Sequence, residues 1–115
     1  MKVSELEGPA LDYWVAKACG WFEENDLHEI EEMSPRFWEE NLMSDGAFSP
    51  STRWEDGGPI IDREGIATEP VPRYRGKWGA KALPWRDEYD AIGPTVLIAA
   101  MRCFCCDKFG EEVPD

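Results

Sequence analysis

The sequence predicts a single α+β domain over residues 1–115, with an N-terminal helix and a long buried C-terminal helix packed on a small antiparallel sheet and a loop-rich middle. Three observations support this class. Residues 94–109 are apolar almost throughout, residues 5–19 carry a helical apolar stripe, and residues 73–82 alternate around glycines. No internal repeat or low-complexity linker divides the chain, so one domain is the economical interpretation.

The first predicted helix runs from about residue 5 to residue 19. Its apolar stripe is Leu11, Trp14, Val15 and Ala18. Two starts are open. Ser4 with Glu7 three residues later forms a capping box, and Pro9 suits the first position of a later start. Gly20 supplies the stop.

The middle of the chain predicts little regular structure. Residues 21–33 are acidic and lack a period, so we expect a loop there, followed by a short helix over residues 35–42 begun by a Ser-Pro pair. Residues 47–59 predict a binding loop, because hydroxyls, one large aromatic and glycines are concentrated there. Gly57-Gly58-Pro59 is a turn signal, and residues 59–62 then predict the entry of a short strand.

A hairpin is predicted around Gly76, with extended pieces within residues 73–80. Trp78, Ala80 and Ala82 alternate with other residues, which indicates a strand with one buried face.

The last predicted helix, residues 94–109, is apolar nearly all round and should be the central buried helix. We expect Pro94 at its first position, Lys108 in its last turn and Gly110 as its stop. Residues 111–115 predict a loose tail.

Charge and composition exclude several functions. The 12 basic and 24 acidic residues give a formal charge of −12, which disfavours duplex nucleic acid as a partner. No stretch approaches the roughly 20 apolar residues that span a bilayer. Residues 1–4 lead directly into acidic sequence, which predicts no signal peptide. We therefore expect a cytosolic protein whose four cysteines are reduced.

Catalytic and metal chemistry find little support. Cys103, Cys105 and Cys106 lack the spacing of zinc ligands and are interpreted as small buried hydrophobes. His28 is the single histidine and lies among acids, as a solvated surface residue would. Glu55 and Asp56 beside two glycines could hold a cation or act as a base, but a turn-forming role explains them as well. No cofactor, metal or catalytic residue is predicted.

The strongest candidate site is the hydroxyl-rich segment around residue 51. In this hypothesis the hydroxyls donate to a phosphate, arginines supply charge, and a tryptophan stacks on a base. The candidate ligand-binding residues are Ser49, Ser51, Thr52, Arg53, Trp54, Arg63, Trp85, Thr95 and Arg102. Thr95 is included because helix N-termini favour anions. Arg102, in an apolar helix, either snorkels to the surface or points into a pocket. The alternative is a structural loop capped by Ser and Thr.

Three separated segments carry a family resemblance. The small NinX-type proteins of tailed bacteriophages resemble this chain, in the same order, at residues 11–20, at residues 48–54 with 57–61, and at residues 93–104 with 108–110. The resemblance implies an accessory protein expressed in the host bacterial cytoplasm, with no assigned reaction. The family's middle motif usually reads Ser-Thr-Asp-Trp. Arg53 stands here in place of the acid, which argues against a carboxylate role at that position and adds a positive charge.

Three functions remain open. The leading hypothesis is a non-enzymatic anti-defence protein that binds and sequesters a small anionic ligand, a nucleotide second messenger of host defence. The alternative is a protein-interaction module that blocks a host or phage protein through its surplus tryptophans and acidic face. The third is a metal-dependent hydrolase using Glu55 or Asp56. A homo-oligomer is also expected, because small binding proteins often build pockets between protomers.

Overall fold

The computed structural model describes residues 1–19, 48–71 and 76–114, and shows the predicted α+β class. The elements in chain order are a 3₁₀ turn η1 (Val3–Glu5), α1 (Gly8–Ala18), α4 (Trp54–Glu64), β1 (Ala67–Pro70), β2 (Trp78–Lys81), β3 (Ala91–Gly93) and α5 (Val96–Phe109). The predicted loop over residues 21–33, the predicted helix over residues 35–42 and the first half of the predicted hairpin lie outside the described residues, as does His28.

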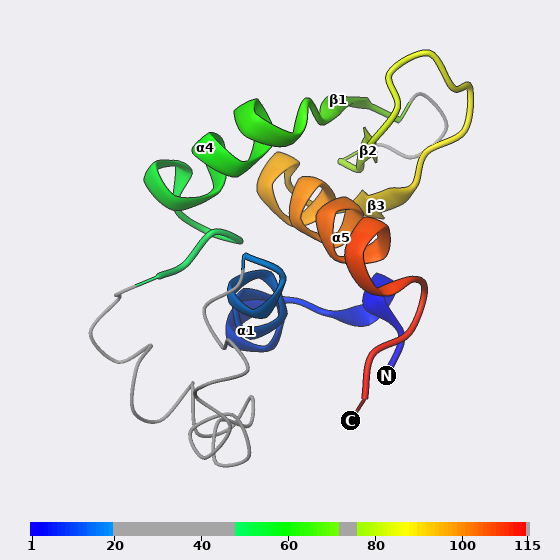
Figure 1. The fold of residues 1–115 in the computed structure, drawn as a ribbon. Helices are drawn as coiled ribbons and strands as arrows, with labels where there is room; N and C mark the ends of the chain where they lie inside the picture. The colour runs from blue at the N-terminus through cyan, green and yellow to red at the C-terminus, as the bar shows by residue number, and fades with distance from the viewer. Residues whose placement is uncertain (20–47, 72–75, 115) are drawn as a thin grey trace, which may run out of the picture.

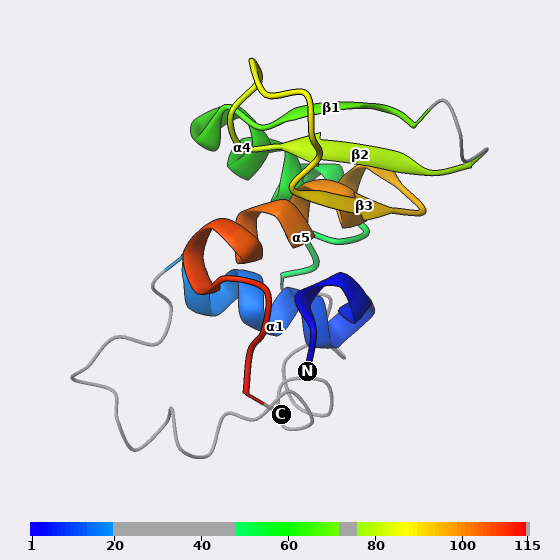
Figure 2. The same ribbon diagram turned by 90° about the vertical axis from the view of Figure 1, so that its right-hand side faces the viewer.

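Helix α5 lies at the centre of the fold and contacts every other element (Figure 1). The sheet lies on one side of α5 and α1 lies on the opposite side (Figure 2). The prediction of a central buried helix is confirmed, as are Lys108 in its last turn and Gly110 at its end. Its start was predicted wrongly: Thr95 is the N-cap and its Oγ1 accepts from the N–H of Ile98 at 3.1 Å, so Pro94 precedes the helix.

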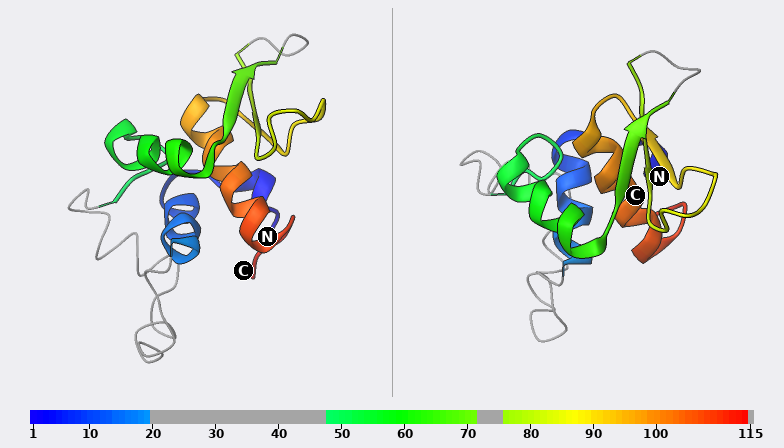
Figure 3. Two further views of the ribbon diagram at one scale, coloured as in Figure 1. Left: turned by 45° about the horizontal axis from the view of Figure 1, so that its top comes forward. Right: turned by 90° about the horizontal axis from the view of Figure 1, so that it is seen from above.

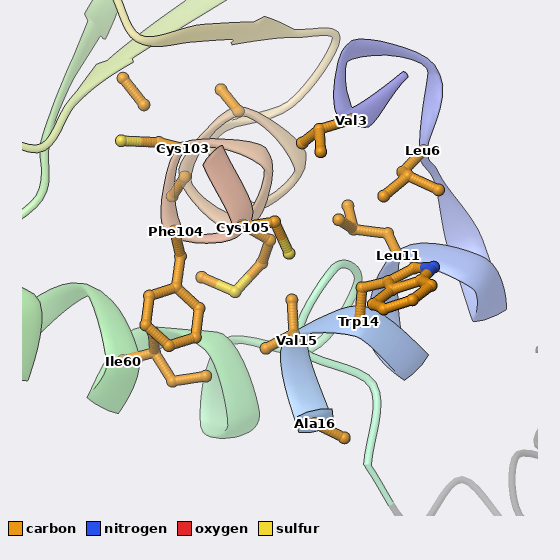
Figure 4. Close-up of a cluster of buried hydrophobic side chains, with 14 of the residues drawn as sticks. Val3, Leu6, Leu11, Trp14, Val15, Ala16, Ile60, Cys103, Phe104 and Cys105 are labelled. Carbon is orange, nitrogen blue, oxygen red and sulfur yellow. The ribbon is translucent and has the colours of Figure 1, made fainter. Parts of the chain in front are cut away.

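Consecutive residues of α5 fill the core in three directions (Figure 4). Cys103 points toward the sheet, Phe104 toward Ile60 of α4, and Cys105 toward α1. Burial raises the pKa of the Cys103 thiol to about 12, so this sulfur stays protonated at neutral pH. Cys103 and Cys105 thus serve as small apolar core residues.

Helix α1 begins at Gly8, not at residue 5, with Pro9 in its first turn. Of the two open starts, the proline start is correct. The capping box is absent because Leu6 is extended (φ −72°, ψ 134°) and its carbonyl accepts from Arg102 Nε at 2.7 Å. A tertiary bond to α5 therefore accompanies the extended segment before α1.

The predicted loop over residues 47–59 and strand entry at residues 59–62 are wrong from Trp54 onward, because α4 occupies Trp54–Glu64. Acidic residues in its first turn complement the helix dipole, and Gly65 ends it in the left-handed conformation (φ +64°). Pro59 lies on the exposed side of α4, where water can satisfy the carbonyl that loses its helical N–H partner.

Gly57 is needed inside α4 because the helix passes close to other backbone. A Cβ at Gly57 would lie 2.5 Å from the carbonyl oxygen of Pro50 and 2.7 Å from Cδ2 of Leu97. Close packing thus explains Gly57, the first glycine of the pair that the sequence analysis interprets as a turn. It does not explain Gly58. A Cβ at Gly58 would meet only Cε3 of Trp54, at 3.8 Å.

The three strands form an antiparallel sheet in the order β1-β2-β3. The predicted strand around Trp78 is confirmed, while the short β3 was not predicted. The prediction of a single buried face for β2 is wrong, because Gly79 is buried as well as Ala80. The ring of Tyr89 lies where a Cβ of Gly79 would be. Gly76 has φ +76°, as the predicted glycine turn requires.

The predicted loose tail is wrong for residues 111–113, which pair with the start of the chain. The N–H of Val3 donates to the carbonyl of Glu111 at 2.9 Å, and the N–H of Val113 donates to the carbonyl of Met1 at 2.9 Å. Val113 is buried. The two ends of the chain therefore lie side by side (Figure 1).

Over the ranges that the structure describes, no helix has the length and apolar character needed to cross a membrane.

Gly57→Ala and Gly58→Ala form a matched pair. Alanine favours a helix over glycine, so Gly58→Ala should stabilise the fold by about 0.5–1 kcal/mol. Gly57→Ala should instead destabilise it by about 1–3 kcal/mol, because its Cβ overlaps Pro50 and Leu97. Urea denaturation measures both. Equal stability of the two variants would contradict the close approach.

Candidate functional site

The segment 48–53, which we name the hydroxyl loop, is held by carboxylates from two helices. The N–H of Ser51 donates to Oδ1 of Asp12 on α1 at 2.8 Å, and the N–H of Ser49 donates to Oδ2 of Asp56 on α4 at 2.9 Å. Within the loop, the N–H of Arg53 donates to the Ser49 carbonyl at 2.8 Å. The loop therefore has a fixed shape, and two of its backbone N–H groups donate to carboxylates of the protein itself.

Asp12 is 1% exposed. The pKa of its carboxyl is raised from 3.8 to about 6, chiefly by burial and also by the nearby Asp56, while the approach of Ser51 acts to lower it. The Ser51 Oγ is buried and has no hydrogen bond of ordinary geometry to a described residue, although it lies close enough to Asp12 to affect that pKa. Asp12 is therefore a buried acid whose pKa is raised to about 6.

A pocket of about 440 Å³ opens beside the hydroxyl loop, at the N-terminal end of α5. Its lining is uncharged and comes from the hydroxyl loop, α4, β2 and α5: Ser51, Thr52, Trp54, Trp78, Pro94, Thr95, Val96, Leu97 and Ile98. Trp54 is 59% exposed at the pocket, and Trp78 is half-buried. Two large aromatic rings therefore meet the start of a helix in one concave site.

The N-terminus of α5 gives this pocket a polar end. The first amides of a helix have no partner within the helix, and the helix dipole places partial positive charge there. Thr95 Oγ1 accepts from Ile98 N, which leaves the amides of Val96 and Leu97 as the first-turn donors. This arrangement can hold a small anion while the tryptophans contact an apolar or aromatic group.

The structure brings together four of the predicted site residues: Ser51, Thr52, Trp54 and Thr95 line this pocket. The other five lie elsewhere. Ser49 is buried in the hydroxyl loop, and Arg53 is exposed and pairs with Glu55. Arg63 lies near the far end of α4 and pairs with Glu64.

Arg102 is buried inside the fold, away from this pocket. Its Nε donates to the Leu6 carbonyl at 2.7 Å and its Nη1 donates to the Ile92 carbonyl at 2.9 Å. It therefore links the N-terminal segment to β3, which was neither of the two placements left open by the sequence.

Trp78 and Asp12 were not among the candidate ligand-binding residues chosen from the sequence. Asp12 had a detectable signal, because Asp12, Val15 and Ala16 share one buried helical face and an acid on such a face is unusual. Glu55 and Asp56, predicted as a turn or a cation site, lie in the first turn of α4, where Glu55 pairs with Arg53. The described segments contain no cluster of three or more histidine, cysteine or acidic residues able to hold a metal ion.

Trp85 lies on a second surface feature, residues 82–90, which we name the tryptophan loop. The N–H of Ala82 donates to Oδ2 of Asp90 at 2.7 Å, and the N–H of Asp90 donates to the Ala80 carbonyl at 2.9 Å. These bonds close the loop at its base, while Trp85 is 78% exposed. The loop projects from the side of the sheet away from α4 (Figure 3). Trp85 lines a hollow formed by residues 85–90, whereas Trp54 lines the pocket beside the hydroxyl loop, so the two tryptophans belong to different surface features.

Comparison with known proteins agrees with the family resemblance of the sequence. The family model described as bacteriophage P22 NinX matches residues 2–108. A search of curated proteins finds no match.

Asp12→Asn tests the buried acid through stability. The folded-state pKa of Asp12 is raised, so its contribution to stability is fully present below the unfolded pKa of 3.8 and is lost as the pH rises through about 6. Asparagine keeps an oxygen acceptor for Ser51 without the charge. From pH 5 to pH 8, the free energy of unfolding of D12N minus that of wild type should therefore increase by on the order of 1 kcal/mol.

Urea denaturation at pH 5, 6.5 and 8 measures this difference. Asp62→Asn, at an exposed position of α4, is the control for loss of one negative charge. Parallel pH profiles for D12N and D62N would show that Asp12 has an ordinary pKa.

Proposed function

The chain belongs to the NinX family of bacteriophage proteins, and we propose that this phage accessory protein binds a small ring-bearing anion of the nucleotide class in the pocket between the hydroxyl loop and α5. In this proposal it performs no reaction. It sequesters a nucleotide second messenger that the bacterial host makes for its defence, and it does so in the host cytoplasm.

The observation that carries the proposal is the meeting of Trp54, Trp78 and the N-terminus of α5 in one pocket. Stacking on an aromatic side chain is worth about 1–3 kcal/mol per base, whatever the base. A helix N-terminus stabilises a phosphate through its amides and dipole. The pocket volume of about 440 Å³ also lies within the range of small-molecule sites.

The residues divide into ring-binding and anion-binding groups. Trp54 and Trp78 contact the base, with Val96 and Ile98 as apolar walls. The hydroxyl of Thr52 and the first amides of α5 bind the anionic group. Ser51 acts through the loop, because it is buried and its amide is held by Asp12.

Native mass spectrometry tests this proposal on protein purified gently from bacteria with an active nucleotide-signalling defence. We expect a discrete added mass of a nucleotide, together with the mass of a homo-oligomer. Thr52→Ala and Trp54→Ala alter exposed positions at the pocket and should each weaken retention of this ligand at least tenfold, since each removes a direct contact. Trp85→Ala is the matched control, because it removes an exposed tryptophan outside the pocket.

Purified mono- and cyclic dinucleotides, titrated against tryptophan fluorescence, give the second measurement. A bare protein in native spectra, with no fluorescence response to any of these nucleotides, would overturn the proposal.

A second candidate function is supported by the tryptophan loop. Exposed tryptophans on preorganised loops are typical binding hot spots, because little conformational entropy is lost on docking. Asp87 and Glu88 beside Trp85 are exposed acids, so the matching partner is a protein with an apolar slot bordered by basic residues.

Trp85→Ala separates the two functions. For a protein partner identified during infection and then purified, W85A should lower the affinity at least tenfold and W54A should leave it unchanged. Isothermal titration calorimetry measures both. The reverse pattern would assign the partner to the pocket instead of the tryptophan loop.

A further inference from the structure

We infer that Asp12 is a positioning residue for the pocket: its ionised carboxylate holds the hydroxyl loop in the shape that lines the pocket, and gain of a proton by Asp12 changes that shape. This inference rests on the proposed binding pocket and adds its regulation by pH.

The geometry places Asp12 one hydrogen bond away from the pocket lining. Its Oδ1 accepts from the N–H of Ser51 at 2.8 Å, and Ser51 and Thr52 both line the pocket. Asp12 belongs to α1 and is separated from Ser51 by 39 residues in sequence. The bond therefore joins the pocket to an element that contributes no residue to its lining.

The two carboxylates that hold the loop differ in their surroundings. Asp56, on α4, is half-buried and its Oδ2 lies 3.9 Å from Nε of Arg53. Asp12 is buried, and within the described ranges it forms no ion pair. The groups that face it there are the negative Asp56 and, from α5, the thiol of Cys105, whose pKa is raised by burial so that it stays neutral.

This environment favours proton uptake by Asp12, because Asp12 is buried and an exposed acid would not be. Burial raises its pKa to about 6, against the opposing effect of the Ser51 bonds. A hydrogen bond to a carboxylate is stronger than one to a neutral acid, so protonation weakens the hold on the Ser51 amide. The new O–H group also gains a possible acceptor, the Ser51 Oγ, which has no other partner of ordinary geometry among the described residues. Both changes alter the hydrogen bonding of Ser51 and so act on the hydroxyl loop.

Nuclear magnetic resonance of the ligand-free, ¹⁵N-labelled protein between pH 4.5 and pH 8 tests the inference. We expect the backbone amides of Ser51 and Thr52 and the indole N–H of Trp54 to shift together, with one midpoint near pH 6. The indole N–H of Trp85, which lies outside the pocket, is the internal control and should not follow this midpoint.

Three variants assign the transition. Asp12→Asn keeps the oxygen acceptor for the Ser51 amide and should abolish the transition near pH 6. Asp56→Asn removes the negative neighbour of Asp12 and should lower the midpoint of the transition. This variant also tests the inference if D12N does not fold. His28→Gln removes the single histidine, which ordinarily titrates near pH 6.5, and should leave the transition in place.

A Ser51 amide that does not titrate near pH 6, or that still does so in D12N, would overturn the inference. The measurement uses no ligand, so its failure is distinct from that of the proposed function. A bare protein in native spectra with an intact Ser51 transition would refute nucleotide binding alone.

Discussion

The burial of α5 is the constraint on which the rest of the structure depends. A helix that is apolar nearly all round must be covered on every side, and here the sheet, α1, α4 and the N-terminal turn each cover part of it. Its one buried cation, Arg102, donates to the carbonyls of Leu6 and Ile92. These bonds offset the cost of burying a charge and also hold the two segments against the helix.

The pocket arises where this covering is incomplete. The N-terminus of α5 emerges between β2 and α4, so its first amides and the adjacent Trp78 meet Trp54 and the hydroxyl loop. The loop approaches closely because Gly57 has no Cβ to separate α4 from Pro50. Asp12 and Asp56 then hold the loop from two helices. The shape of the pocket is thus a consequence of packing around α5, and the acids fix it.

The sequence predicted those parts of the fold that one continuous pattern encodes. The apolar run of α5 and the stripe of α1 are such patterns, and both helices were found. Helix α4 was missed because Gly57-Gly58-Pro59 is locally a turn signal, while the close contact with Pro50 and Leu97 that explains Gly57 involves distant residues. The start of α1 at Gly8 follows the second of the two local signals, Pro9. The bond from Arg102 to Leu6, just before α1, joins residues far apart in the sequence and has no local signal.

The same distinction holds for the candidate site. Hydroxyls and a tryptophan close together in sequence predicted a ligand site at Ser51, Thr52 and Trp54. These three residues line one pocket, and their binding of a ligand stays a prediction. The choice of arginines from the sequence rested on charge alone, and the structure places Arg63 and Arg102 in other contacts. The role of Trp78 depends on the register of β2 with β3, which pairs Trp78 with Gly93 just before α5. Spacing along the chain carries no information on that register.

The absence of charge in the pocket lining determines what kind of ligand it can hold. A helix N-terminus contributes roughly 0.3–1 kcal/mol toward a single anion at low ionic strength, and the formal charge of −12 on the chain opposes every further negative charge. Stacking on a tryptophan contributes more, about 1–3 kcal/mol per base. In the proposed binding, the rings of the ligand therefore supply most of the affinity, and its anionic group mainly sets its orientation. A ligand with planar rings and few charges fits these terms, whereas a polyphosphate does not.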